Sequence, residues 1–356
     1  HMISMFESAK YAGQNKRIII TETGWPSQGG SLKGAYASNE NAIKYFIDSQ
    51  NWSKQNDIEM FYFSSFDESW KVGPEGEVGA YWGVWDKNLS TKEMENMINV
   101  CLENKITTFD HAETYGDYTT ESDFGKAFVS SKIAREKMQL ISKCGVQLVT
   151  ESRNNTIRHY DYSKEYIIWS AENSLKNLQT DYLDVLLLHR PSPLMQADEI
   201  AEAVLKLKSD GKIIDFGLAS FSASQTELIR QKTEISYNQV QFSATNYKPM
   251  VDGSFDYMET NNIRPLSGNP LGSVFREDNS QTRRLKKLLL SLMEKYNLGS
   301  DSILLSWILQ HPAKVIPIAG TVNVARIQSL MKAVELELDK EDWFAIWVES
   351  MGNDVP

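Results

Sequence analysis

In the stretch ITTFDHAETYG, residues 106–116, a short apolar run is followed directly by several polar side chains. An apolar run of this length without period-2 alternation is typical of a strand buried on both faces. Similar runs alternate with longer amphipathic segments, and repeated strand-then-helix order indicates parallel β/α architecture. The expected strands are residues 17–23, 58–66, 79–85, 106–112, 138–145, 182–189, 213–220, 237–244, 263–269 and 315–320.

The amphipathic segments carry ordinary helix signals. Ser38 and Ser90 precede two of them as N-caps, and Gly211 ends a third. The number of repeats favours a closed (β/α)8 barrel of the TIM type over an open doubly wound sheet, and no GxGxxG follows the first strand. A barrel of this type closes with eight strands, and the sequence offers nine or ten. We therefore expect one or two surplus strands at the N-terminus.

Composition narrows the possible partners. A net charge of −10 and a pI near 5.2 argue against nucleic acid and anionic membranes, both of which require a basic face. Cys101 and Cys144 lie in apolar runs, which predicts buried free thiols, and no metal-ligand spacing of Cys or His is present. His1-Met2 is typical of a tag remnant. We expect a cytoplasmic monomer without a membrane segment or a metal.

Residues from about 82 to 356 resemble the aldo-keto reductases, in a branch of bacterial oxidoreductases. The matching landmarks occur in family order: FDHAETYG, ISKCG, LLLHRP, GKIIDFGLASF, NQVQFS, PLSGNPLG and PIAGTVNVARI. The resemblance covers most of the chain and implies a barrel that reduces carbonyl compounds with NADPH.

The resemblance maps the family's catalytic tetrad onto Asp110, Tyr115, Lys143 and His189. The chemistry agrees with this assignment. Hydride transfer to a carbonyl requires a proton donor at the developing alkoxide, and a tyrosine serves when a lysine ammonium favours its phenolate. A buried aspartate pairs with that lysine, and a histidine orients the carbonyl oxygen. All four residues lie at or just past expected strand ends, where barrel active sites are found.

The same resemblance implies two different halves of an NADP site. The adenosine half is retained, with Gln239 also kept and Arg326 as the residue that contacts the 2′-phosphate in the family. At the nicotinamide half, Ala219-Ser220 replaces a Ser-Asn pair, Gly268 replaces a stacking aromatic, and Asn246 stands where close relatives carry His. Losing the stacking ring or the amide clamp costs about 1–3 kcal/mol each. We interpret the changes as engineered replacements, with natural divergence as the alternative. The candidate cofactor contacts are Ser220, Gln239, Leu271, Gly272, Gly320, Thr321 and Arg326.

Residues from about 3 to 88 resemble the C-terminal part of a family 17 glycoside hydrolase of the β-1,3-glucanase type. TETGWPS matches that family's nucleophile strand, which makes Glu22 the candidate nucleophile. A retaining glycosidase also needs an acid about 5–5.5 Å away, and the part of the family that supplies it is missing here. Glu113, beside Tyr115, is the candidate replacement. The candidate sugar contacts are Trp25, Asp67, Glu68, Trp70 and Lys71.

The two resemblances overlap in the loop YWGVWDKN, residues 81–88. We therefore predict a chimeric barrel in which a glucanase-like β/α/β fragment, residues 1–88, joins a reductase-like body, residues 89–356, within one structural domain. Three hypotheses follow from it. The protein is an NADPH-dependent carbonyl reductase using Tyr115, a β-glucan hydrolase using Glu22, or a fold chimera without activity.

Overall fold

The computed structural model describes residues 2–13, 20–23, 36, 38–56, 60–62, 89–150, 152–321 and 324–355. The chain divides into two compact units, His1–Ser90 and Thr91–Pro356. The predicted strand 79–85, the overlap loop 81–88 and the candidate sugar contacts Trp25, Asp67, Glu68, Trp70 and Lys71 lie outside the described residues.

The N-terminal unit contains a β/α/β motif. Strand β1 (Ile20–Thr23) pairs in parallel with β2 (Met60–Tyr62), and α2 (Asn39–Asn56) connects them. The Ser38 hydroxyl accepts the Asn41 N–H at 3.1 Å, as the predicted N-cap requires. Helix α1 (Met2–Gly13) packs on α2 through an edge-to-face pair of rings, Phe6 and Trp52. Among the described strands, β1 and β2 form a two-stranded sheet of their own.

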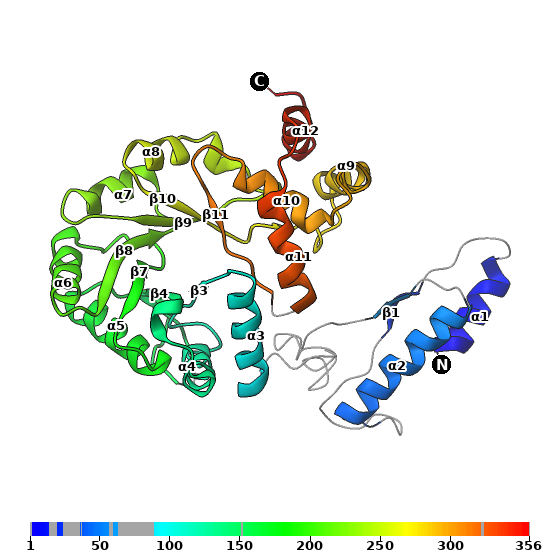
Figure 1. The fold of residues 1–356 in the computed structure, drawn as a ribbon, viewed down its shortest axis with the longest axis horizontal. Coiled ribbons are helices and arrows are strands. Elements are labelled where there is room, and N and C mark those ends of the chain that lie inside the picture. Colours follow the sequence, from blue (N-terminus) through cyan, green and yellow to red (C-terminus); the bar gives the residue numbers. More distant parts are fainter. Residues whose placement is uncertain are drawn as a thin grey trace. The chain divides into compact units, whose positions relative to one another are not determined.

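The C-terminal unit is built on a curled, seven-stranded parallel sheet in the order β11-β10-β9-β8-β7-β4-β3 (Figure 1). This confirms the predicted (β/α)8 barrel-like fold. Each strand of this sheet lies within an apolar run expected to form one. The strands are β3 (Thr108–Asp110), β4 (Gln139–Cys144), β7 (Leu183–Leu188), β8 (Ile213–Ala219), β9 (Tyr237–Gln241), β10 (Arg264–Gly268) and β11 (Ile316–Pro317).

Helices cover the outer face of this sheet (Figure 1). They follow the strands in alternation, which places the carboxyl ends of all seven strands at one rim. The helices are α3 (Thr91–Glu103), α4 (Thr120–Ser131), η2 (Arg135–Lys137), α5 (Lys164–Leu178), α6 (Ala197–Ser209), α7 (Ala223–Arg230), η3 (Lys248–Met250), α8 (Ser254–Thr260), α9 (Ser280–Tyr296), α10 (Ser300–Leu309), α11 (Val324–Glu335) and α12 (Lys340–Met351).

The core lies between the helices and the outer face of the sheet. Leu183, Leu186 and Leu188 of β7 are fully buried there, while Leu187 packs with Val185 and others in a smaller cluster. Burying each leucine contributes about 1.5–3 kcal/mol. The continuous apolar pattern of β7 therefore comes from burial on both faces of the strand.

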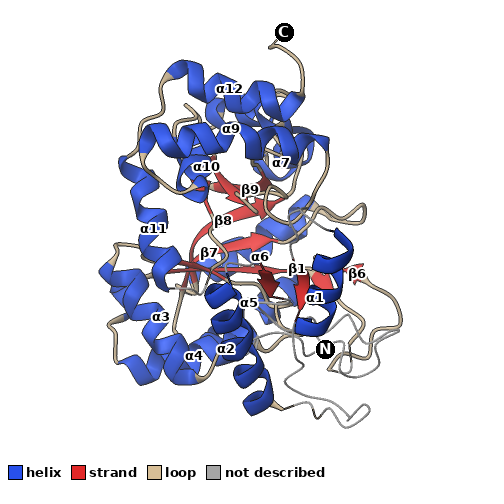
Figure 2. Ribbon diagram, turned by 90° about the vertical axis from the view of Figure 1, so that its right-hand side faces the viewer, coloured by secondary structure: helices blue, strands red, loops and turns tan. Residues whose placement is uncertain are grey.

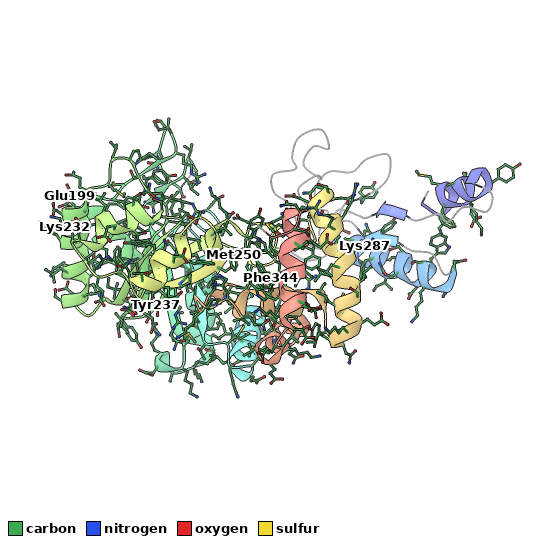
Figure 3. The ribbon with its side chains drawn as sticks, turned by 90° about the horizontal axis from the view of Figure 1, so that it is seen from above. Glu199, Lys232, Tyr237, Met250, Lys287 and Phe344 are labelled. Atoms are coloured by element: carbon green, nitrogen blue, oxygen red, sulfur yellow. The ribbon has the colours of Figure 1, made fainter. Side chains whose placement is uncertain are left out.

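Helices α9, α10 and α12 pack together at one end of the unit (Figure 2). The rings of Trp307 and Trp343 stack at 5.2 Å, and each indole N–H donates to the other residue's carbonyl. Met250 and Phe344 line an open cavity of about 520 Å³ beside this pair (Figure 3). The stacked indoles fix α12 against α10.

One element was absent from the sequence prediction. Strands β5 (Val146–Gln147) and β6 (His159–Tyr160) form an antiparallel hairpin between β4 and α5. In the described part of the chain no helix is long and apolar enough to cross a membrane, and no cluster of three His, Cys, Asp or Glu side chains is placed to hold a metal. Cys101 and Cys144 are buried free thiols, as predicted.

Candidate active site

The predicted tetrad residues meet at the carboxyl rim of the sheet. Asp110 is the last residue of β3, Lys143 lies near the end of β4, and His189 follows β7 directly. Strands β3, β4 and β7 are neighbours in the sheet, so their ends stand side by side. Tyr115 reaches the same point from the loop that leaves β3.

Lys143 is the centre of the cluster. Its side chain is 0% exposed, and Nζ lies 2.7 Å from Asp110 Oδ2. The ammonium also donates to the His111 carbonyl at 2.8 Å and to the Tyr115 hydroxyl oxygen at 3.2 Å. Its three donors are therefore all satisfied, as a buried ammonium requires. Gln239 Nε2 donates to the same Asp110 oxygen at 3.1 Å, so this predicted residue also belongs to the cluster.

Tyr115 and His189 form the face of the cluster toward the rim. The Tyr115 side chain is 41% exposed, and its ring stands edge-on to the His189 imidazole at 6.0 Å. Burial, followed by the positive charges of Lys143, Arg190 and Arg158, lowers the pKa of His189 to about 3. The imidazole is therefore neutral at pH 7. A phenol held by an ammonium beside a neutral imidazole is suited to give a proton to a developing oxyanion.

Glu113 is buried away from this face. Its carboxylate accepts the Gly145 N–H at 2.8 Å, the Tyr166 hydroxyl at 2.9 Å and the Ser170 hydroxyl at 2.6 Å. Burial raises the pKa of Glu113, and the three hydrogen bonds oppose that rise. Both carboxylate oxygens of Glu113 are thus hydrogen-bonded, one to the backbone of Gly145, just after β4, and the other to two side chains of α5. The other predicted member of the glycosidase pair, Glu22, lies in β1 of the N-terminal unit.

The nicotinamide half of the predicted cofactor site carries small side chains. Ala219 ends β8, and Ser220 follows it with a left-handed φ of 64°. Gly268 ends β10, and a Cβ added there would meet Gln239 Cγ and Val240 O at 3.8 Å, which is ordinary contact. The Asn246 amide donates to the Gln241 carbonyl at 3.1 Å.

The adenosine half of the predicted site is a cavity of about 630 Å³ beyond the ends of β10 and β11. Gly272 is required there, because its φ is 58° and a Cβ would stand 2.0 Å from Thr245 Oγ1. Arg276 donates to the side-chain oxygen of Asn269 and to the Gly272 carbonyl. The structure brings five predicted residues together in this cavity: Leu271, Gly272, Gly320, Thr321 and Arg326.

Arg190 is a site residue that the sequence analysis did not single out. Its side chain donates to the His189 carbonyl at 3.0 Å and to Ser220 Oγ at 2.9 Å. Its position directly after His189, within LLLHRP, was the available signal. The β5–β6 hairpin adds another cation, Arg153, which stacks over the rings of Tyr118 and Trp169.

Two family models match the chain. The model described as "Aldo/keto reductase family" matches residues 78–347, and the "BtgE/BtgC glycoside hydrolase domain" matches residues 1–83. The first match confirms the predicted reductase resemblance, and the second confirms a glycoside hydrolase resemblance at the N-terminal end of the chain. The two matched ranges overlap at residues 78–83.

Curated relatives match the C-terminal part of the chain. Oxidoreductase YcsN of Bacillus subtilis is 37% identical, over 77% of this chain and 94% of its own length. Oxidoreductase YdhF of Escherichia coli is 36% identical, over 80% of this chain and 97% of its own length. A 6-dehydroglucose reductase of Agrobacterium fabrum is 29% identical over 77% of the chain.

Solved structures share the fold. The thermostable aldo-keto reductase Tm1743, solved with the inhibitor epalrestat, matches with a TM-score of 0.62 at 25% identity, covering 73% of this chain and 88% of that one. An aldo/keto reductase from Klebsiella pneumoniae, solved with NADP and acetate, matches with a TM-score of 0.62 at 21% identity, covering 72% and 84%.

Proposed function

This chain belongs to the aldo/keto reductase family, and on that premise we propose that its C-terminal unit reduces a carbonyl compound with NADPH. The observation that carries the proposal is the Lys143 ammonium, which bridges the Asp110 carboxylate and the Tyr115 hydroxyl. The third hydrogen bond of this buried ammonium goes to a phenol oxygen, so a positive charge stands beside the group that would give up a proton.

The residues at the carboxyl ends of the seven strands fit an NADPH molecule. Its adenosine end would occupy the cavity lined by Gly272, Gly320 and Arg326, where glycine lets a ligand approach the backbone and an arginine carries the charge that a phosphate pairs with. Its nicotinamide end would lie at the ends of β8 and β10, where the contact distances at Gly268 leave space. When bound, NADPH supplies the hydride that the carbonyl carbon accepts.

The proton follows a short route. Tyr115 gives its hydroxyl proton to the carbonyl oxygen as the carbon–hydrogen bond forms, so the product is an alcohol. The remaining phenolate lies beside the Lys143 ammonium, which stabilises it. The neutral His189 imidazole orients the oxygen without competing for the proton. The exposed Tyr115 side chain then regains a proton from solvent.

NADPH binding, followed by protein fluorescence, and NADPH oxidation at 340 nm with 4-nitrobenzaldehyde test the proposal. We expect saturable binding and slow turnover, and we expect Tyr115→Phe to lower kcat by about 100-fold or more while NADPH binding is kept. Absence of binding at millimolar NADPH would overturn the proposal. So would turnover that is unchanged in Tyr115→Phe.

We further propose that the protein is a chimera that acts as a monomer. The support for a chimera is the glycoside hydrolase match over residues 1–83, which overlaps the reductase match only at residues 78–83. A second candidate function, hydrolysis of a β-glucan with Glu22 as nucleophile, rests on that match and on the β/α/β motif that contains Glu22. Glu113 is a poor proton source for it, because three donors already occupy its carboxylate.

Laminarin is the substrate that separates the remaining hypotheses. A β-glucanase releases reducing ends from laminarin, and Glu22→Gln abolishes that release. Hydrolysis that survives Glu22→Gln would count against the second function. A protein that neither binds NADPH nor cleaves laminarin would be a fold chimera without activity.

A further inference from the structure

Arg190 is held in place through its backbone. Its N–H donates to the Tyr162 hydroxyl at 3.0 Å, and that hydroxyl donates to the Arg190 carbonyl at 2.5 Å. Tyr162 is itself buried against Gly145, whose absent Cβ would stand 1.9 Å from the Tyr162 ring. The arginine therefore leaves the end of β7 in a defined direction.

The guanidinium is only partly used by the protein. Nη1 donates to the His189 carbonyl and to Ser220 Oγ, while Nε and Nη2 have no hydrogen-bond partner among the described residues. Within the same residues Arg190 makes no ion pair. A half-buried guanidinium with a free edge is unusual, because its planar fork matches a carboxylate.

The two acidic side chains of the described site, Asp110 and Glu113, are hydrogen-bonded to groups other than Arg190. Asp110 is engaged by Lys143 and Gln239, and Glu113 by its three donors. Lys143, Arg190 and Arg158 all act on His189 as positive charges. This rim is thus locally cationic in a chain whose net charge is −10. Such a local reversal of sign attracts anionic ligands.

We propose that Arg190 binds a carboxylate on the carbonyl substrate, so that the preferred substrates are carbonyl acids. The inference rests on the proposed reductase function. Arg190 adjoins His189, whose ring faces Tyr115, so a carboxylate on the guanidinium places the rest of the molecule beside the proton donor. The hydrogen bonds from Nη1 to the His189 carbonyl and to the Ser220 hydroxyl hold the guanidinium in this position.

Two aldehydes of matched size test the proposal: 4-carboxybenzaldehyde, which is an anion at pH 7, and neutral 4-nitrobenzaldehyde. In Arg190→Gln we expect kcat/KM for the carboxylate to fall by about 10–100-fold, since hydrogen bonds to charged groups are lost. We expect the nitro compound to change by less than about threefold. Arg190→Lys keeps the charge and loses the planar fork of the guanidinium. Its kcat/KM for 4-carboxybenzaldehyde should therefore lie between the values of wild type and Arg190→Gln. Arg283→Gln, at an exposed ion pair on α9, is the matched control.

An equal loss for both aldehydes, with a raised KM for NADPH, would overturn the proposal and assign Arg190 to the cofactor. Equal kinetics in wild type and Arg190→Gln would overturn it as well. Binding of benzoate, measured by thermal shift against benzamide, separates the inference from the proposed function. If no aldehyde is reduced and benzoate binding still depends on Arg190, the reductase function fails and the carboxylate site stands. If benzoate binding is the same in Arg190→Gln, the carboxylate site fails.

Discussion

Lys143 and Asp110 form an ion pair at 2.7 Å in which the lysine side chain has no contact with solvent. Each charge depends on the other, because an isolated charge at this depth has no water to solvate it.

Asp110→Asn removes the negative charge and keeps the shape of the side chain. We expect the free energy of unfolding to fall by about 3–5 kcal/mol, because Lys143 is left as an uncompensated buried cation. Urea unfolding measures this loss. Lys143→Met in the Asp110→Asn background should recover part of it, and a double variant less stable than Asp110→Asn would contradict the account.

Stability should fall on acidification through His189. Its folded pKa, about 3, lies below the ordinary value of 6.5, so the neutral form is favoured by folding. The stabilisation is complete above pH 6.5 and is lost as pH falls toward 3, by about 1.4 kcal/mol per pH unit. Urea unfolding of wild type and His189→Gln at pH 7 and pH 5 checks the sign. The difference between the two proteins should shrink at pH 5.

His111, buried against Phe124, behaves in the same way, because burial and the charge of Lys143 lower its pKa to about 3. It therefore serves as an internal comparison. His111→Gln should reduce the acid sensitivity as His189→Gln does, whereas only His189→Gln should also reduce carbonyl turnover.

Ser220 has a left-handed backbone, which costs an L-residue other than Gly, Asn or Asp about 1–2 kcal/mol. We expect Ser220→Asn to raise the free energy of unfolding by about 0.5–1 kcal/mol. Thermal unfolding is the measurement. Ser224→Asn, at an exposed position inside α7, should instead be slightly destabilising because asparagine is a weaker helix former. A similar change at both positions would refute the backbone explanation.

Gly268→Tyr should strengthen NADPH binding. The added Cβ has room, and a ring at the end of β10 provides a stacking surface worth about 0.5–1.5 kcal/mol, or roughly 2–10-fold in Kd. Fluorescence titration measures the change. Gly272→Ala is the contrasting variant, because its left-handed φ and the 2.0 Å approach to Thr245 predict a less stable protein.

The sequence predicted the strands and the contacts of Lys143 with Asp110 and Tyr115, but it missed one hairpin and the partners of Glu113. Strands such as β7 and β8 were found because burial on both faces leaves a continuous apolar run. The β5–β6 hairpin was missed because two-residue strands leave no pattern. The partners of Glu113 were missed because Tyr166 and Ser170 lie 53 and 57 residues away and meet it only through the packing of α5.

The clamp between the Tyr162 hydroxyl and residue 190 uses only main-chain atoms of residue 190. It therefore holds the backbone of residue 190 in place whatever side chain that residue carries. A single codon change at 190 would leave the framework of the rim intact while replacing its ligand-facing charge with an apolar, acidic or amide group. The fold thus provides a position at which substrate preference can change quickly, by mutation or by design, while the framework that supports the catalytic residues stays the same.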